Sequence, residues 1–577
     1  MMRPSILLLL LAAACTNDSL DYPQVADPTP WNAPRDDRIA TSTGLDTLPL
    51  GDPVGVEFTL EGYAQFLWVL TVPPGSLAAL SDPGAPKPVF TPDVAGDYAV
   101  EVTAADAFGG AVQTASRRFY GGTYLGQAAC AQCHGDTEAE VRLTEHASVF
   151  ERAGPAIFSG GAGCFACHVV DPVPSPAPPP SGSFGEAAAA EGLDPATYAY
   201  TTFTQFALDY PQSAARANVQ CENCHGPGSQ HNGDPRRISV PLRSIVCGIC
   251  HTGVVGPNVR VQWENSAHGN DPPAAAVADP SCRRCHTAAG FIDTVEGRPP
   301  REITAGAPGQ TCAACHNPHS ATLPFQIRIF GTVTVGGGDA YNGGRAAACL
   351  VCHQSGVQDP QAYALANNGP PCATQSDMIA TRGSVEYDGA YSASFHAGTS
   401  FRLRSFTGDP DDSDTPDSCV ICHMDDGPAG PLAEELGGHT VTMRSGAEIN
   451  ITACTPCHAT LTTFDRTARG DYDGDGTIDG VQTEVRRLLA NLASAIFAAD
   501  TGGAVTQPGG PTTPMLVAPG IATTAALREA VFNYNFVAID GSFGIHNTSY
   551  AVQILQRTYG ALTGVPYATA FPDALIR

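Results

Sequence analysis

Eighteen of the twenty cysteines in this chain occur in nine copies of the pattern Cys-x-x-Cys-His. Two thiols separated by two residues can each form a thioether to one vinyl group of a single porphyrin, and the adjacent histidine then becomes the proximal ligand of the iron. Thioredoxin-like dithiols do not recur nine times, and zinc ribbons do not place a histidine after every second cysteine. The pattern therefore predicts nine covalent haem c groups.

The nine motifs are numbered here in chain order. They comprise Cys130, Cys133 and His134 (motif 1); Cys164, Cys167 and His168 (motif 2); Cys221, Cys224 and His225 (motif 3); Cys247, Cys250 and His251 (motif 4); Cys282, Cys285 and His286 (motif 5); Cys312, Cys315 and His316 (motif 6); Cys349, Cys352 and His353 (motif 7); Cys419, Cys422 and His423 (motif 8); and Cys454, Cys457 and His458 (motif 9). Only Cys15 and Cys372 remain, so no intramolecular disulfide framework is expected. Covalent haem attachment implies assembly outside the cytoplasm.

The haem-binding region is predicted to extend from residue 120 to residue 470. Residues 120–577 provide about 50 residues per haem, too few to build a conventional apolar core around each group. We therefore expect the porphyrins to form the core of a loop-rich, mainly α region with sparse regular secondary structure. Short helices should carry the motifs, and little sheet is expected apart from Phe325 to Val335.

Distal iron ligands are expected among the remaining histidines. The chain has sixteen histidines, and nine of them are proximal, which leaves seven candidates: His146, His231, His268, His319, His396, His439 and His546. Three of these recur in Ser/Thr-x-His after an aromatic or apolar stretch, which favours a shared role. The sequence does not pair each candidate with a motif. Because seven candidates cannot occupy nine sixth positions, we expect at least two haems without a distal histidine, for which methionine is the usual substitute.

The N-terminus has the features of an export signal. Arg3 precedes a short apolar core, Ile6 to Leu11, which ends in small residues before Cys15. This resembles a lipoprotein signal peptide over residues 1–14, and the resemblance implies acylation of Cys15. The residue after Cys15 is Thr16, which by the same resemblance favours the outer membrane. Residues 15–35, rich in proline and aspartate, are expected to form a linker.

A small all-β domain is predicted from residue 36 to residue 119. Val54, Val56 and Phe58 alternate as one face of a strand, and further β-branched and aromatic runs follow, separated by turn signals such as PPGS and SDPG. The segments FLWVLTVPPGS and VFTPDVAGDYAVEV resemble a PKD-type immunoglobulin-like domain. The resemblance implies Trp68 in the core and no disulfide, and it favours a spacer without a ligand of its own.

Several local patterns beyond Cys-x-x-Cys-His carry a wider resemblance. They are YLGQAACAQCH, CENCHGPGSQH, WENSAH, CHNPH, GGHTVTM and GIHNTSYAVQIL. Together they resemble the multihaem c-type cytochromes of bacterial respiration. Histidine at both axial positions leaves no iron site for a substrate and lets electrons move with little rearrangement. The resemblance thus implies electron transfer between redox protein partners or to extracellular acceptors, in the periplasm or at the outer cell surface.

Two alternatives to an electron carrier remain at this point. The first is a redox enzyme acting on hydroxylamine or on nitrogen or sulfur oxyanions at a haem that lacks a distal histidine. The Cys-x-x-Cys-Lys type of active site is excluded, because the chain contains a single lysine, Lys87. The second alternative is a subunit of an extracellular cytochrome filament, which a lipid anchor disfavours. The electron carrier is the favoured function.

Charge bears on the partners. The chain carries 57 acidic and 30 basic side chains, a formal net charge of −27. Nucleic acid is excluded as a partner, because binding phosphates requires a basic surface. Contact with a membrane is expected through the lipid anchor only, since the longest apolar run, nine residues, is too short to span a bilayer. The acidic surface favours basic partners, minerals or metal ions.

The C-terminal part adds a candidate calcium loop, residues 471–484, and a helical region, residues 485–577. Asp471, Asp473, Asp475, Gly476 and Asp479 have the spacing of the first positions of an EF-hand-type loop. The twelfth position departs from the pattern, so Glu484 is expected to close the loop as the bidentate ligand. Helices are predicted at 481–499, 525–537 and 548–562, each with an apolar face packing on the haem core.

Overall fold

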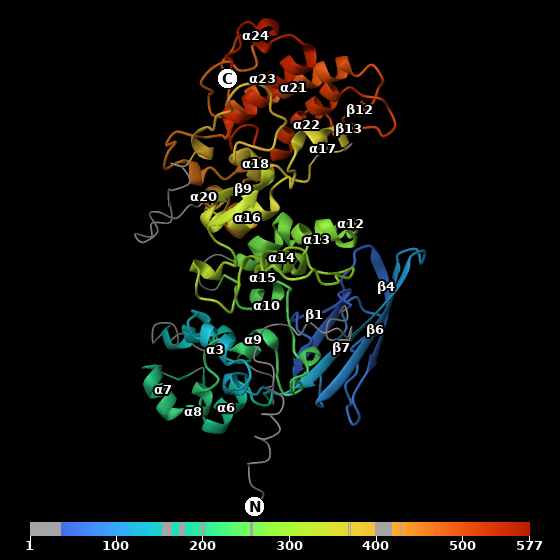
Figure 1. Ribbon diagram of the computed structural model, residues 1–577. Helices are drawn as coiled ribbons and strands as arrows, with labels where there is room; N and C mark the ends of the chain where they lie inside the picture. Colours follow the sequence, from blue (N-terminus) through green and yellow to red (C-terminus); the bar gives the residue numbers. More distant parts are fainter. Residues whose placement is uncertain are drawn as a thin grey trace, which may run out of the picture. The chain divides into compact units, whose positions relative to one another are not determined.

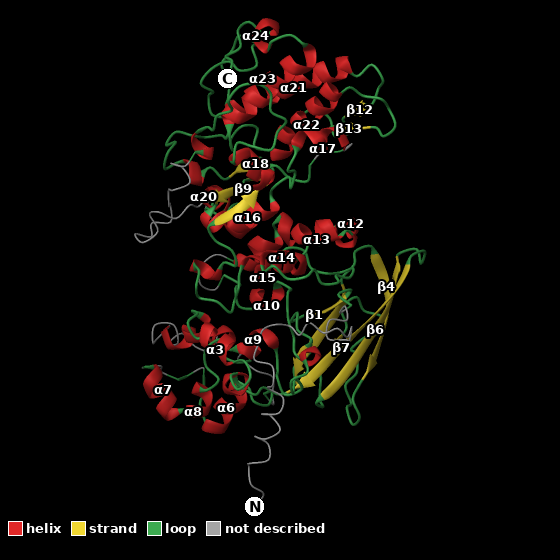
Figure 2. Cartoon of the chain, viewed as in Figure 1, coloured by secondary structure: helices red, strands yellow, loops and turns green. Residues whose placement is uncertain are grey.

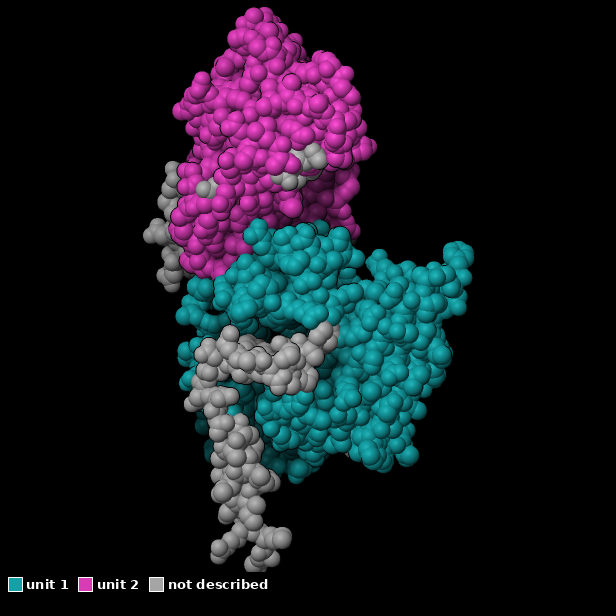
Figure 3. All heavy atoms as spheres, turned by 45° about the vertical axis from the view of Figure 1, so that its right-hand side comes forward, with its two compact units in different colours: residues 1–328 teal, residues 329–577 magenta. Residues whose placement is uncertain are grey.

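The computed structural model describes residues 36–152, 164–171, 179–195, 197–198, 202–253, 258–366, 369, 371–398, 418–427 and 430–577. The expected signal peptide, Cys15 and the linker that ends at residue 35 lie outside the described residues. The chain divides into two compact units, unit 1 from Met1 to Arg328 and unit 2 from Ile329 to Arg577 (Figure 3). The division falls between motifs 6 and 7.

Unit 1 contains a β-rich region of two open sheets (Figure 2). Its strands are β1 (Ile39–Thr41), β2 (Thr47–Pro49), β3 (Val54–Phe58), β4 (Tyr63–Thr71), β5 (Val89–Phe90), β6 (Gly96–Asp106) and β7 (Val112–Gly122). One sheet has the order β1-β3-β5 and the other has the order β2-β7-β6-β4. Neighbouring strands are antiparallel except β2 and β7, which are parallel.

Alternating side chains of these strands form the core of the β-rich region. Val54, Val56 and Phe58 of β3 are buried, and the residues between them are partly exposed. Trp68 is 2% exposed, and its indole N–H donates to the carbonyl of Ala85 at 3.0 Å. The predicted alternation and the predicted core position of Trp68 are therefore confirmed.

The rest of unit 1 is made of short helices joined by loops. The helices are α2 (Gln127–Cys130), α3 (Gly135–Val141), η1 (His146–Ser148), α5 (Phe165–His168), α6 (Phe184–Glu191), α7 (Phe203–Asp209), α8 (Pro211–Ala214), α9 (Cys221–His225), η3 (Pro235–Arg237), α10 (Ile245–Gly248), α11 (Val259–Glu264), η4 (Ala267–Gly269), α12 (Ala274–Ala278), α13 (Pro280–His286), α14 (Ala288–Val295), α15 (Cys312–Cys315) and η5 (Pro324–Gln326). None of these described helices exceeds eight residues. Such short helices are marginal alone, so their stability must come from what they pack against.

Unit 2 begins with short helices and strands joined by loops, and it ends in longer helices (Figure 1). Its elements are β8 (Thr332–Val335), η6 (Gly336–Gly338), β9 (Asp339–Asn342), η7 (Gly344–Ala346), α16 (Ala347–Cys352), α17 (Pro360–Ala366), α18 (Gln375–Ile379), η8 (Phe395–Ala397), α20 (Ser418–His423), η9 (Pro431–Glu434), η10 (Gly438–Thr440), β10 (Arg444–Ser445), β11 (Glu448–Ile449), η11 (Thr452–Cys454), α21 (Val481–Ala499), β12 (Val505–Thr506), β13 (Leu516–Val517), α22 (Ala525–Asp540), α23 (Thr548–Thr563) and α24 (Tyr567–Ala570). The three helices predicted at the C-terminus are confirmed as α21, α22 and α23.

The C-terminal helices share an apolar core. The side chains of Val485, Leu488, Leu489, Leu492 and Ile496, predicted to form one face of α21, are all buried. That face packs against α22 and α23, and α17 and α18 add to the same cluster. The tail therefore has an apolar core of its own, and the packing of these helices on the haem core stays a prediction. Within the described residues, no helix combines the length and the apolar character needed to span a membrane.

The strand expected from Phe325 to Val335 forms only in its second half. Residues 332–335 make β8, which pairs with β9, but residues 324–326 form the turn η5. Phe325 has a φ of 55°, and its carbonyl accepts from Nδ1 of His316 at 2.8 Å. The strand prediction is wrong for this stretch because the backbone turns there and hydrogen-bonds a motif histidine.

Candidate functional site

Each motif lies on a short helical turn or at its end. Motif 3 is a helix by itself, α9, and motifs 5, 7 and 8 occupy α13, α16 and α20. Motifs 1, 2, 4 and 6 begin on or beside α2, α5, α10 and α15, and motif 9 begins at the end of η11. One helical turn brings side chains three residues apart to the same face, so the two thiols of a motif can reach one porphyrin edge.

Five of the seven candidate distal histidines lie opposite a proximal histidine. The pairs and the distances between their ring centres are His134–His231 at 6.3 Å, His146–His251 at 6.1 Å, His225–His319 at 5.8 Å, His396–His458 at 6.2 Å and His423–His546 at 6.3 Å. A nitrogen-to-metal bond of about 2.0 Å and a nitrogen-to-centre distance of about 1.1 Å put two imidazole centres about 6.2 Å apart across one iron. The five pairs therefore have the separation that one shared iron requires.

Five of these ten imidazoles are oriented by a hydrogen bond from Nδ1. The Nδ1–H of His225, His231, His396 and His423 donates to a backbone carbonyl at 2.7, 2.9, 2.9 and 2.9 Å, on Ser239, Asp234, Ile545 and Val441 respectively. His546 instead donates to the carboxylate of Asp540 at 2.7 Å. A histidine that ligates a metal typically donates its other N–H in this way. Nε2 is thereby left to bind iron.

Burial also sets the protonation of the candidate ligands. Burial, followed by the neighbouring His225 and Arg328, lowers the pKa of His319 to about 4. Burial likewise lowers the pKa of His146, His268 and His396. A neutral imidazole keeps the lone pair that a metal needs. His546 differs: burial opposes its charge, but the Asp540 carboxylate outweighs that effect and raises the pKa.

Thiols from different motifs face one another. The sulfur atoms of Cys130 in motif 1 and Cys221 in motif 3 are neighbours, and this contact raises the pKa of Cys130 and lowers the pKa of Cys221. The same contact joins motifs 2 and 4 through Cys250 and Cys167, motifs 4 and 6 through Cys247 and Cys312, and motifs 7 and 8 through Cys349 and Cys419. Porphyrins attached at these positions would be close neighbours.

His268 and His439 are the other two distal candidates, and both are half-buried. His439 lies on η10, and His268 stacks on Trp263 with ring centres 5.6 Å apart. His268 also lines a cavity of about 510 Å³ that includes Thr311, the residue before Cys312. Arg243 and Arg260 line the same cavity, and planar guanidinium groups suit the carboxylates of a haem. These residues could hold a haem attached at motif 6.

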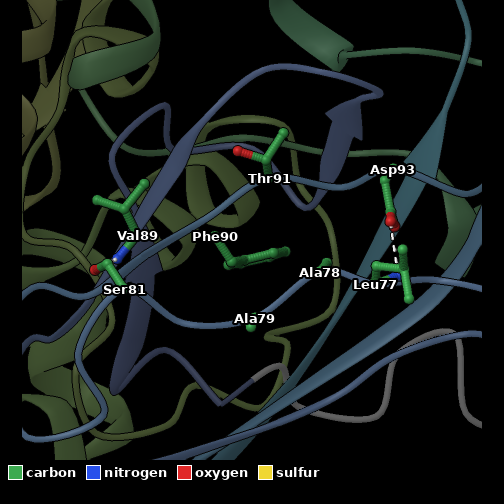
Figure 4. Close-up of a pocket in the computed structure, with 8 residues that line it drawn as sticks. All are labelled: Leu77, Ala78, Ala79, Ser81, Val89, Phe90, Thr91 and Asp93. Atoms are coloured by element: carbon green, nitrogen blue, oxygen red, sulfur yellow. Dashed lines mark hydrogen bonds between the residues drawn. The ribbon is translucent and has the colours of Figure 1, made fainter.

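A second cavity, of about 460 Å³, lies in the β-rich region (Figure 4). Its lining includes the exposed Leu77, the buried Phe90 and Asp93, which accepts from the Leu77 N–H at 2.7 Å. None of its lining residues is a histidine or a cysteine. We assign it no part in haem binding.

The β-rich region is joined to motif 3 by buried hydrogen bonds. The Ser239 hydroxyl accepts from the N–H groups of Asp46 and Thr47 at 2.8 and 2.9 Å, and the Ser239 carbonyl accepts from His225 Nδ1. The Thr47 hydroxyl donates to the His225 carbonyl at 2.6 Å. An ion pair between Arg237 and Asp97 lies on the same face. The β-rich region is therefore held against motif 3 by direct contacts.

Glu222, inside motif 3, ties the chain that leads into motif 1. Its carboxylate is buried and accepts from the N–H groups of Leu125, Gly126 and Gly228. Hydrogen bonds to a charged carboxylate are among the stronger ones in proteins. The Glu222 side chain of motif 3 thus holds the chain that leads into motif 1.

Ser239→Ala should lower the free energy of unfolding by about 1–3 kcal/mol, because two buried amides lose their acceptor. Denaturant unfolding of the full holoprotein measures the change. Ser116→Ala, which removes an exposed hydroxyl on β7, is the control and should be nearly neutral. Equal stability of the two variants would contradict a supporting role for Ser239.

The acidic loop brings three of its five predicted ligands together. Asp471, Asp473 and Glu484 are buried, and each offers an oxygen within 4.8 Å of the other two. Asp475 and Asp479 instead form ion pairs with Arg487. Burial, followed by the nearby Glu484 and Asp475 charges, raises the pKa of Asp473 to about 6. The local fold therefore holds acidic groups at a cost that a bound cation would relieve.

No protein-family model matches this chain. Multiheme cytochrome MtrA from Shewanella baltica is 29% identical over 117 residues, which cover 18% of this chain and 30% of that protein. The C-type polyheme cytochrome OmcC from Geobacter sulfurreducens is 26% identical over 178 residues, 30% of this chain and 20% of OmcC. OmcB from the same species is 37% identical over 79 residues, 13% of this chain and 10% of OmcB.

Parts of this chain are homologous to multihaem c-type cytochromes. The homology implies covalently bound haem c, in agreement with the motifs. The chain spans between a tenth and about a third of the length of the curated relatives it matches. Among solved structures, the PKD domain from KIAA 1837 protein is similar, with 19% identity, a TM-score of 0.12, and coverage of 13% of this chain and 74% of that domain.

Proposed function

We propose that this protein is a nonahaem c-type cytochrome that conducts electrons between redox partners in the periplasm or at the outer cell surface. The observation that carries the proposal is the set of five imidazole pairs, each with ring centres 5.8–6.3 Å apart. Two imidazoles on one iron leave no position for a substrate. Such sites suit electron transfer rather than chemistry on a bound molecule.

The contacts around the motifs support conduction from haem to haem. Nδ1 hydrogen bonds fix the orientation of the candidate ligands, so that little rearrangement accompanies a change of oxidation state. Cysteines of motifs 1 and 3, 2 and 4, 4 and 6, and 7 and 8 are neighbours, which favours short distances between the porphyrins attached to them. Haem c supplies the one-electron chemistry, and the chain supplies position and axial ligands.

Electron paramagnetic resonance of the oxidised holoprotein tests this function, together with its mass and film voltammetry. We expect a mass that includes nine haems, at least five low-spin bis-histidine signals and reversible electron exchange with an electrode. Because there are only seven candidate distal histidines for nine irons, a haem with an open sixth coordination position is a further possibility. A high-spin haem that turns over nitrite, hydroxylamine or tetrathionate would replace the carrier by an enzyme. Nine low-spin bis-histidine haems in the monomer would refute the ligand count.

The proposal includes attachment to the outer membrane through Cys15, a PKD-type fold for residues 36–119, and the remaining domain boundaries predicted from the sequence. Support for the anchor comes from the apolar segment and the small residues before Cys15. The contacts between the β-rich region and motif 3 add a supporting role to the spacer predicted for that region.

Cys15→Ser should release the protein from membranes, because the lipid can no longer be attached. Fractionation of cells that produce the variant, followed by haem staining, checks this result. Cys372→Ser, which alters the other cysteine outside the motifs, serves as the control and should stay membrane-bound. Membrane association of Cys15→Ser equal to that of the unaltered chain would refute the anchor.

A further inference from the structure

The acidic loop before α21 contains a feature that hydrogen bonding does not explain. Asp473 is 2% exposed, and its Oδ2 has no hydrogen-bond partner. The nearest basic group, Nη1 of Arg487, lies 3.6 Å from that oxygen. Asp471 and Glu484 each place an oxygen within 4.8 Å of one on Asp473. This buried oxygen accepts no hydrogen bond, and three carboxylates with one guanidinium nearby leave an excess of negative charge that a bound cation would balance.

The chemistry of this cluster fits calcium. Calcium takes six to eight oxygen ligands from carboxylates, carbonyls and water, in flexible geometry. The three carboxylates provide oxygen and no nitrogen or sulfur, which disfavours zinc, copper and iron. Glu484 is fixed toward the loop because its carboxylate accepts from the N–H groups of Tyr472 and Asp479, at 2.7 and 2.8 Å.

Glu484 belongs to the first turn of α21, and the same end of α21 holds another loop, residues 541–547, named here the ligand loop. Gln482 donates to the Ser542 carbonyl at 2.9 Å. The Arg486 guanidinium lies 4.2 Å from the centre of the Phe543 ring. A side chain added at Gly544 would meet Val481 and Val485 at 3.1 and 3.0 Å, so α21 and the ligand loop are in close contact.

The ligand loop contacts or carries the candidate distal ligands of two motifs. It carries His546, which faces His423 of motif 8, and its Ile545 carbonyl accepts from Nδ1 of His396 at 2.9 Å. His396 in turn faces His458 of motif 9. Ser542 accepts from the His546 N–H at 3.1 Å and donates to Asp540, the carboxylate that orients the His546 imidazole. α21 contacts the ligand loop, and the loop in turn carries His546 and hydrogen-bonds His396, so a shift of α21 would be passed to both distal ligands through the loop.

We propose that calcium binds Asp471, Asp473 and Glu484 and that its occupancy secures, through α21 and the ligand loop, the distal ligands His546 and His396 of motifs 8 and 9. The effect of calcium on His546 and His396 rests on the haem ligation of the proposed function. The cation site itself does not depend on that function. Metal binding to the folded chain stabilises it by mass action, so the site also strengthens the C-terminal helices.

The test uses the full holoprotein after treatment with a chelator and its removal. Calorimetric titration with Ca²⁺ should detect one site that prefers Ca²⁺ to Mg²⁺. Asp473→Asn, which is nearly isosteric, should weaken binding at least about tenfold, because a carboxylate ligand is lost. Asp573→Asn, at an exposed aspartate, is the matched control and should bind like the unaltered chain. Absence of Ca²⁺ binding to the unaltered chain would overturn the site whether or not the variants fold.

Electron paramagnetic resonance of the same samples tests the coupling. Removal of Ca²⁺ should diminish low-spin bis-histidine signals equivalent to two haems, and its return should restore them. Ca²⁺ binding without any change in these signals would overturn the coupling and leave the proposed function intact. A Ca²⁺-loaded protein without bis-histidine signals would overturn the coupling and the proposed haem ligation together.

Discussion

His319→Ala is expected to remove the six-coordinate, low-spin signature of the haem at motif 3. His319 faces His225 with ring centres 5.8 Å apart and planes 8° from parallel. Its loss opens one axial position and removes a strong donor to iron. We expect a new high-spin signal that responds to cyanide, and a rise in the reduction potential of this haem on the order of 0.1 V.

Electron paramagnetic resonance with a redox titration measures both effects. Ser320→Ala, which alters the half-exposed residue next to His319, is the control and should leave the spectrum unchanged. His231→Ala should produce the corresponding change at motif 1 and spare motif 3. An unaltered low-spin count in His319→Ala would contradict the assignment of His319 to this haem.

Phe536→Ala should destabilise unit 2 by about 3–5 kcal/mol, the usual cost of emptying a buried phenylalanine site. Phe536 lies on α22, is fully buried and meets the Tyr550 ring of α23 edge-on at 6.2 Å. The cavity would lie among side chains from α21, α22 and α23, which have little freedom to close it.

Calorimetric or denaturant unfolding of the holoprotein detects this loss. Phe497→Ala provides a matched control, because Phe497 belongs to α21 but is 44% exposed. We expect the control to lose well under half of what Phe536→Ala loses. Similar losses in the two variants would mean that the tail helices lack the shared core described above.

The sequence predicted best what is local. A Cys-x-x-Cys-His motif sets its own chemistry within five residues, and the apolar face of α21 follows from helical periodicity. The alternation in β3 and the burial of Trp68 are equally local signals. The candidate distal histidines came from counting, which needs no geometry.

The sequence could not show which distal histidine faces which proximal histidine, because the two come from distant segments of the chain. His251 faces His146, which precedes motif 2, and His423 faces His546, which follows motif 9. Nothing in the neighbourhood of either residue indicates its partner. The strand prediction at Phe325 was wrong for a related reason, since the turn there hydrogen-bonds His316, nine residues earlier.

The acidic loop illustrates the same limit at shorter range. Five carboxylates at the expected spacing do not all converge, because Arg487, two turns into the helix that follows, pairs with Asp475 and Asp479. Asp540 also went unrecognised. Its role depends on the turn that brings it to His546, six residues later, and an aspartate at a helix end gives no signal of that role.

The five histidine pairs also have a bearing on how the protein is made. His134, His225 and His251 find their partners within unit 1, and His423 and His458 find theirs within unit 2. A chain synthesised from its N-terminus can thus finish coordination at motifs 1, 3 and 4 once residue 319 has emerged. Motif 8 must wait for residue 546, after every other motif has been made. If these pairs bind haem as proposed, the three pairs of unit 1 can form before unit 2 is complete, and the pair at motif 8 can form only after motif 9 has been synthesised.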